Sequence, residues 1–212
     1  GQRSWHKIFP NACGDWAPGH FLHRFIVIIS NGLVEISRYT LAEEEMTVGI
    51  FGPSDIIGIS AVLKKTTYPG SAKTLMKGSE LIKVYLRPVL QDKGEPVAEI
   101  QTWIREMVLL HEQVLRDKID ILNAGSVENR VFELLNHLIR RFGKQESHLQ
   151  HFIPIRLTRA QIGKLIDVRV ETIIRLISRW KKQKLITWKD SGILIPNLPL
   201  LEKSLMKNKN SK

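Results

Sequence analysis

A long helical pattern in the middle of the chain constrains the fold most. From Pro96 to Ala124 no glycine and no further proline interrupts the sequence, and residues recur at helical spacing. The eight positions in this register are Val97, Ile100, Ile104, Met107, His111, Val114, Lys118 and Ile121. All of them except His111 and Lys118 are apolar. Alternating steps of three and four place these side chains along one stripe of a helix of about 28 residues. We therefore expect residues 96–125 to form a long helix between two other parts of the chain.

The stripe is suited to pairing with a second copy of the same helix. Helices whose apolar residues repeat every 3.5 positions pack together as coiled coils. The apolar surface is wide enough to contact the chain's own N-terminal part as well, because further residues flank it: Trp103, Val108, Leu110 and Leu115. We expect a homodimer, and the alternative is a helix that packs only on its own domain. The expected dimerisation residues are Ile100, Ile104, Met107, His111 and Val114.

The residues before this helix favour β-structure. Short apolar runs alternate with turn residues: Phe25–Ile29, Leu33–Ile36, Met46–Phe51 and Leu81–Tyr85. Asn31-Gly32 is a dipeptide typical of two-residue hairpin turns. Short strands between such turns favour a small antiparallel barrel or jelly roll. We expect residues 1–95 to form a β-domain, so that the whole chain is α+β.

The excess positive charge lies after the long helix. The net charge is +11; residues 1–125 carry 14 Lys and Arg against 14 Asp and Glu, whereas residues 126–212 carry 18 against 7. A basic segment joined to a neutral one indicates a domain that binds a polyanion such as double-stranded DNA. The apolar runs are much shorter than the roughly 18 residues of a membrane span, so we expect a cytoplasmic protein without a membrane partner.

Two short helices in the basic segment have the pattern of a helix-turn-helix. Gly125-Ser126 ends the long helix, and Thr158–Gln161 has the residues of a capping box. This pattern predicts a helix from Arg159 to about Ile166, a turn near Asp167, and a second helix from about Val170 to Lys182. The second helix should bury Ile173, Leu176, Ile177 and Trp180. A following hairpin, Leu185–Trp188 with Ile193–Ile195, would complete a winged helix over residues 126–212.

The exposed face of the second helix has side chains that read bases. Arginine binds guanine O6 and N7 through paired hydrogen bonds, and a carboxylate accepts from the N4 amine of cytosine. Glu171 and Arg175 are one turn apart and would read adjacent bases in this way. The alternative is a surface ion pair worth under about 0.5 kcal/mol. We also expect DNA contacts, chiefly to phosphates, from Thr158, Arg159, Arg169, Thr172, Arg179 and Lys182.

Together these motifs resemble the Crp/Fnr family of bacterial transcription regulators across nearly the whole chain. The residues that carry the resemblance are Leu157–Gly163, Val170–Arg179, Leu185-Ile186, Asn31-Gly32, Gly52–Gly58 and Gly70–Ala72. The resemblance implies a cyclic-nucleotide-binding-like sensor domain, a dimer, and contact with RNA polymerase as an activator. It also implies a palindromic site near TTGAT–ATCAA or a variant such as TGT–ACA. Ile174 stands where the family usually has serine before the reading arginine.

The sensor part departs from the family's cyclic-AMP-binding members. Those members have glutamate and arginine at the positions held here by Ile59 and Gly70. A buried phosphate without its guanidinium is strongly disfavoured, so we do not expect cyclic AMP. An iron–sulfur cluster needs several cysteine ligands, and Cys13 is the one cysteine. We therefore exclude such a cluster.

The sequence leaves the effector open. Glu45–Phe51 and Ile57–Ala61 are similar to the cyanobacterial nitrogen-control regulator, which implies nitrogen regulation by 2-oxoglutarate or another small acid held by Arg105, Arg116 or Lys73. Haem bound through one of seven histidines, and no effector at all, are the alternatives. The expected pocket residues are Gly58, Ile59, Ser60, Ser71, Ala72, Lys73 and Arg105.

Rival functions lack comparable motifs. The sequence has no glycine-rich phosphate loop, no Ser/His/Asp set and no metal-ligand spacing, so we expect no enzyme and no metal site. The winged helix could instead dock another protein. Binding to duplex DNA that weakens steeply with salt distinguishes these functions.

Overall fold

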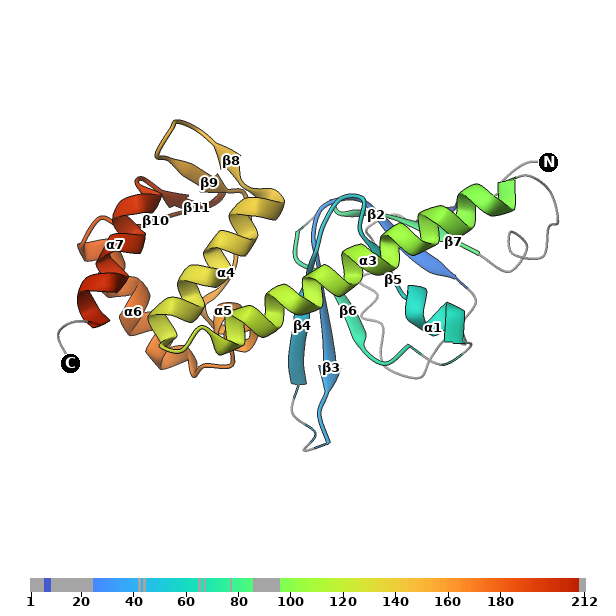
Figure 1. The fold of residues 1–212 in the computed structure, drawn as a ribbon, viewed down its shortest axis with the longest axis horizontal. Helices are drawn as coiled ribbons and strands as arrows, with labels where there is room; N and C mark the ends of the chain where they lie inside the picture. The colour runs from blue at the N-terminus through green and yellow to red at the C-terminus, as the bar shows by residue number, and fades with distance from the viewer. Residues whose placement is uncertain are drawn as a thin grey trace. The chain divides into compact units, whose positions relative to one another are not determined.

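The computed structural model describes residues 6–8, 25–41, 43, 45–64, 66, 68–76, 78–85 and 96–209 (Figure 1). The chain divides into two compact units, Gly1–Arg116 and Asp117–Lys212. The division falls inside the long helix α3, Pro96–Asn123, whereas the sequence places boundaries at residues 95 and 125. The α+β class, with β-sheets first, then a long helix and a winged helix-turn-helix, is confirmed.

The described residues of the first unit include two antiparallel sheets. One has the strand order β1-β7-β2-β5, with bounds His6–Ile8, Glu80–Val84, Ile26–Asn31 and Ile56–Ile57. The other has the order β4-β3-β6, with bounds Glu45–Phe51, Val34–Tyr39 and Ser71–Thr74. A short helix, α1 (Ile59–Lys64), follows β5. The helix α1 was not anticipated, because its six residues are too few to show a helical period.

The expected hairpin at Asn31-Gly32 is wrong. Gly32 has the positive φ, 92°, that an Asn-Gly turn requires. However, β2 and β3 belong to different sheets, so the dipeptide carries the chain from one sheet to the other. The sequence thus identified the backbone conformation but not the strand's partner.

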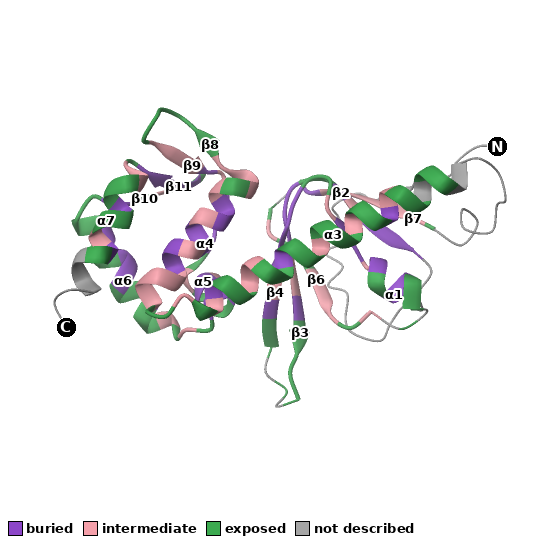
Figure 2. Ribbon diagram, in the orientation of Figure 1, coloured by how far each residue is buried: buried purple, intermediate pink, exposed green. Residues whose placement is uncertain are grey.

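One side of α3 packs onto the first unit's sheets. Ile104 joins a buried cluster with Ile26, Ile56 and Ile59, and Val114 joins another that includes Phe51. Figure 2 shows buried residues at intervals along α3, with exposed residues between them. No helix among the described residues is long and apolar enough to cross a membrane.

The second unit contains the two helices expected to bind DNA, together with two further helices and a sheet. Its helices are α4 (Val127–Phe142), α5 (Arg159–Ile166), α6 (Val170–Lys182) and α7 (Leu198–Lys209). Its sheet has the order β10-β11-β9-β8, with bounds Thr187–Lys189, Gly192–Ile195, His151–Ile153 and Lys144–Gln145. The wing hairpin is therefore present and gains a third and a fourth strand. Residues 144–151, which are mostly polar, contain β8 and the start of β9.

Candidate nucleic-acid interface

The helix α5 begins at the capping box that the sequence indicates. Thr158 Oγ1 accepts a hydrogen bond from the Gln161 amide at 3.1 Å, and Gln161 Oε1 accepts one from the Thr158 amide at 2.8 Å. These bonds satisfy two amides that a helix N-terminus otherwise leaves without partners. At the other end, Asp167 adopts a left-handed conformation, with φ 55°, and its amide donates to Gly163. The helix thus has defined ends on both sides.

A glycine allows the turn to pass close to α5. A Cβ atom added at Gly163 would lie 2.5 Å from the carbonyl oxygen of Val168. The Val168 amide donates to the Gly163 carbonyl at 2.9 Å. Close contact between these two backbone segments therefore sets where α6 begins.

The helix α6 buries the face that its sequence predicts. Ile173, Leu176, Ile177 and Trp180 are all buried. The side chains expected to reach DNA lie on the opposite, exposed face: Arg169, Glu171, Thr172, Arg175, Arg179 and Lys182. Ile174, which replaces the family's serine, is exposed on the same helix. Ala160 of α5 is also exposed.

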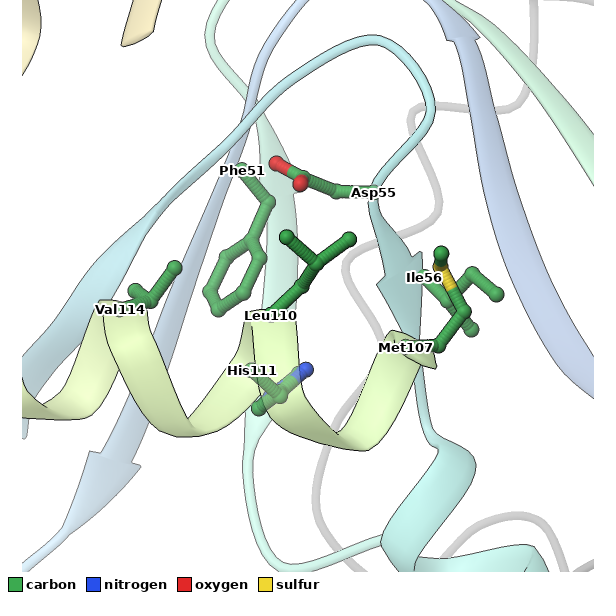
Figure 3. Close-up of a pocket in the computed structure, with 7 residues that line it drawn as sticks. All are labelled: Phe51, Asp55, Ile56, Met107, Leu110, His111 and Val114. Atoms are coloured by element: carbon green, nitrogen blue, oxygen red, sulfur yellow. The ribbon is translucent and has the colours of Figure 1, made fainter. Parts of the chain in front are cut away.

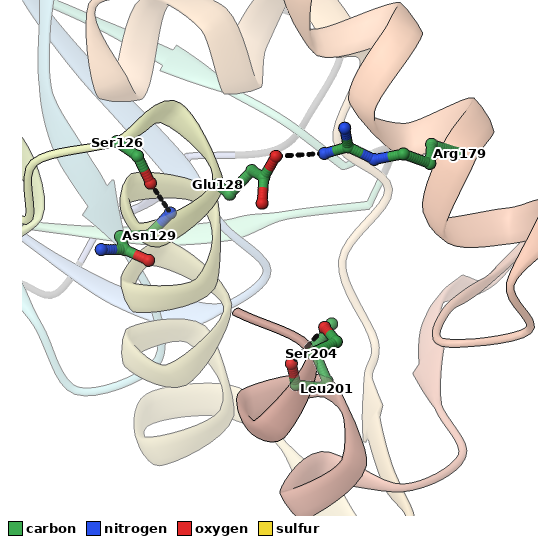
Figure 4. Close-up of polar contacts among 6 residues, drawn as sticks. All are labelled: Ser126, Glu128, Asn129, Arg179, Leu201 and Ser204. Carbon is green, nitrogen blue, oxygen red and sulfur yellow. Dashed lines mark hydrogen bonds and ion pairs between the residues drawn. The ribbon is translucent and has the colours of Figure 1, made fainter. Parts of the chain in front are cut away.

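Arg179 is paired within the protein. Its guanidinium contacts Glu128 in the first turn of α4 (Figure 4). The same turn is capped by Ser126, whose Oγ accepts from the Asn129 amide at 3.2 Å. The sequence places Arg179 on the DNA-facing side, and the structure adds a carboxylate beside it.

Arg159, at the start of α5, lies over a ring of the wing. Its guanidinium carbon is 4.4 Å from the centroid of the Trp188 ring on β10. Cation–π contacts of this kind orient a guanidinium while leaving its edge free for an anion. Sequence reasoning identified Arg159 but missed Trp188, because the two residues are far apart in the chain and only the folded sheet brings them together.

The comparisons with known proteins agree with this geometry. Residues 129–204 match the Crp-like helix-turn-helix domain. The chain is 26% identical over 178 residues to "Transcriptional activator protein anr" of Pseudomonas aeruginosa, which covers 80% of this chain and 70% of that protein. It is 25% identical over 164 residues to the "Fumarate and nitrate reduction regulatory protein" of Yersinia pestis, which covers 76% of this chain and 64% of that protein.

Solved structures share the fold. FixK2 from Bradyrhizobium japonicum superimposes with a TM-score of 0.72 at 14% identity and covers 94% of this chain and 96% of that one. TTHB099, a CRP-family transcriptional regulator from Thermus thermophilus, also gives 0.72 at 14% identity, over 93% and 95%. The chain therefore carries a Crp-like helix-turn-helix domain and is similar to Crp/Fnr transcription regulators over most of its length. Nitrogen regulation and the similarity to the cyanobacterial regulator are not supported, because the relatives include anaerobic and fumarate and nitrate reduction regulators.

The expected effector residues do not line one pocket of the first unit, which lies beside α3. That pocket lies between α3 and the β4–β5 region, and its residues are Phe51, Asp55, Ile56, Met107, Leu110, His111 and Val114 (Figure 3). Ser60 and Lys73 are exposed, and Ser71 and Ala72 are partly buried. Arg105 is exposed and donates to Thr102 at 3.2 Å. The described residues form no group of three or more His, Cys, Asp or Glu that could hold a metal ion, and Cys13 lies outside them.

The structure shows the surroundings of Ile59 and Gly70, the two residues that differ from those of the cyclic-AMP-binding members. Ile59 is buried in an apolar cluster. A Cβ atom at Gly70 would collide with the Ser37 backbone carbonyl, so an arginine fits there only if β3 moves. Tyr68 packs against Gly58 and donates from its hydroxyl to the Phe25 carbonyl. Burial raises the pKa of Tyr68 above its ordinary value, which keeps the hydroxyl protonated.

The expected dimerisation residues mostly face the first unit itself. Ile104 and Val114 are buried, and Met107 and His111 line the pocket, where the His111 ring stacks 4.9 Å from that of Phe51. The side chain of Ile100 lies outside the described residues. Other apolar residues of α3 are exposed: Val108, Leu109, Leu110, Leu115 and Ile119. An interface between two α3 helices would therefore use members of this exposed set that share one face of the helix.

Proposed function

We propose that the protein binds a palindromic DNA site as a homodimer, with α6 in the major groove and Glu171 and Arg175 reading bases. The observation that carries this proposal is the division of α6 into a buried apolar face and an exposed face with its arginines. A helix fixed by its core on one side can present the other side to base edges at a constant angle. The flanking cations Arg159, Arg169 and Lys182 would contact phosphates.

In this proposal the three parts have separate tasks. Residues 1–95 form the sensor domain, residues 96–125 the dimerisation helix, and residues 126–212 the DNA-binding domain. The sensor responds to a small molecule other than cyclic AMP, which is supported by the lack of room for a side chain at Gly70. We also propose activation through contact with RNA polymerase, since one relative is named a transcriptional activator.

Substitution of Arg175 tests the assignment of the reading residues. Arg175→Ala should weaken binding to the selected palindrome by about 1–3 kcal/mol and leave binding to random duplex nearly unchanged. Fluorescence anisotropy with both duplexes over a series of salt concentrations measures each affinity. The control is Lys203→Ala, which removes an exposed charge of α7. Equal losses on both duplexes would contradict base reading by Arg175. If the wild type bound neither duplex, DNA binding itself would be contradicted, and binding that did not weaken with salt would contradict the phosphate contacts.

A further inference from the structure

The end of α5 is held by two cations from other helices. Lys118 of α3 donates a hydrogen bond from Nζ to the carbonyl of Leu165, and Arg130 of α4 donates from Nη1 to the carbonyl of Ile166 at 3.4 Å. The last carbonyls of a helix have no partners within the helix and carry partial negative charge. Both contacts therefore stabilise the C-terminal end of α5 and fix its position.

That end of α5 determines where α6 starts. Asp167 follows directly in its left-handed conformation, and Arg169 is already the N-cap of α6. Between the two helices, the chain is fixed by the Val168 amide on the Gly163 carbonyl. A displacement of Leu165 and Ile166 would thus shift the first turn of α6, which carries Glu171.

The last two turns of α3 are built into the DNA-binding unit by further contacts. Asp117 Oδ2 lies 2.7 Å from His137 Nδ1 on α4, and His137 is buried. Ile121 is buried as well, and Asn129 donates to the Ala124 carbonyl at 3.0 Å. The segment 117–123 is therefore held on both its polar and its apolar sides, and Lys118 has a defined position from which to reach α5.

We propose that Lys118 is a positioning residue for DNA recognition, which fixes the end of α5 and thereby the placement of α6. This inference rests on the proposed function of α6. Lys118 itself is not a phosphate contact, because it is only partly exposed and its ammonium is engaged by the Leu165 carbonyl.

The electrostatic setting of Lys118 agrees with this role. Burial lowers its pKa to about 8, and the nearby Asp167 carboxylate opposes that decrease. The ammonium therefore remains mostly charged at neutral pH and makes the stronger, charge-assisted form of hydrogen bond with Leu165.

The test compares three full-length variants. Lys118→Met keeps the length and apolar stem of the side chain without its donors, Lys118→Arg keeps a charged donor, and Lys203→Met removes a lysine of α7 as the control. Anisotropy gives the affinity for the palindrome and for random duplex at several salt concentrations. Hydrogen exchange gives the protection of the Val168 and Thr172 amides, which lie in the turn and in the first turn of α6.

Lys118→Met should weaken binding to the palindrome about tenfold and binding to random duplex much less, because base contacts need exact placement and phosphate contacts tolerate a shift. Its salt slope should equal that of the wild type, and exchange at Val168 and Thr172 should accelerate. Lys118→Arg should match the wild type in affinity for both duplexes, in salt slope and in exchange at the two amides.

Several outcomes would overturn the proposal. A salt slope reduced by about one would make Lys118 a phosphate contact. Equal losses on both duplexes, with unchanged exchange at the two amides, would show that Lys118 does not position the turn before α6. If the wild type bound no DNA at all, the proposed function would fail, while the exchange measurement would still show whether Lys118 fixes the turn.

Discussion

Glu128 places a negative charge beside a side chain expected to contact DNA. It lies in the first turn of α4, where the helix dipole stabilises a carboxylate, and it contacts the guanidinium of Arg179. A partly exposed ion pair of this kind contributes about 1 kcal/mol or less. Because a guanidinium has five N–H donors, Arg179 can keep Glu128 on one edge and bind a phosphate with another. In the proposed complex, α4 would therefore fix the direction from which Arg179 approaches the backbone.

His137 gives the second unit a pH-dependent stability. Burial lowers the pKa of His137 below the ordinary value of 6.5. The hydrogen bond with Asp117 raises the pKa in part, and the charges of Arg141 and Arg140 lower it further. The unfolded chain thus binds a proton more readily than the folded one, and stability is lost as the pH falls below 6.5 toward the folded pKa.

The variant His137→Gln, which keeps a donor for Asp117, should lose less stability than the wild type between about pH 7.5 and about pH 5.5. The slopes of the free energy of unfolding against pH should differ by up to about 1.4 kcal/mol per pH unit. Urea unfolding at both pH values measures the free energy of unfolding of the wild type and of the variant. His148→Gln, an exposed histidine of the same unit, should behave as wild type; identical slopes for wild type and His137→Gln would contradict the role of burial.

Elements with a clear period were predictable, and contacts between distant segments were not. The bounds of α3, α5 and α6 follow from apolar spacing and, for α5, from the capping residue Thr158, which acts within a few positions of itself. The sheet partner of β2, the contact of Glu128 with Arg179, and the reach of Lys118 to Leu165 depend on segments brought together only by the complete fold. For the same reason, the sequence showed that α3 has a wide apolar surface but assigned the face packed on its own domain to a second copy.

The junction of α5 and α6 depends on a glycine within a helix. Helix propensity alone predicts that Gly163→Ala stabilises α5 by about 1 kcal/mol. The added methyl group would instead lie 2.5 Å from the Val168 carbonyl oxygen, so the turn must move. We expect a net loss of about 1–3 kcal/mol, as for other overpacked sites, measured by urea unfolding. Ala160→Gly, at an exposed position of the same helix, should cost about 1 kcal/mol or less through propensity alone. A more stable Gly163→Ala would show that the turn relaxes without cost.

At the scale of the whole molecule, the proposed dimer depends on which face of α3 remains uncovered. At about 100° per residue, Val108, Leu115 and Ile119 lie within about 40° of one another, whereas Leu109 is about 100° from Val108. Val108, Leu115 and Ile119 are 41%, 43% and 57% exposed, although they are apolar and close together on one face. Two helices paired through this face would bury these three side chains of each helix.

Charge placed on that face should therefore separate the subunits. Leu115→Glu combined with Ile119→Glu puts four carboxylates into the proposed interface, where burial of unpaired like charges is strongly unfavourable. Sedimentation equilibrium should show a dimer for the wild type and a monomer for the double variant. The monomer should also bind the palindrome much more weakly than the dimer, because only one half-site is occupied at a time. Leu109→Glu, an exposed leucine of the same helix outside the face, should remain dimeric. If Leu109→Glu dissociated the dimer and the double variant did not, the subunits would pair through a different face of α3, because side chains about 100° apart cannot share one narrow helix seam.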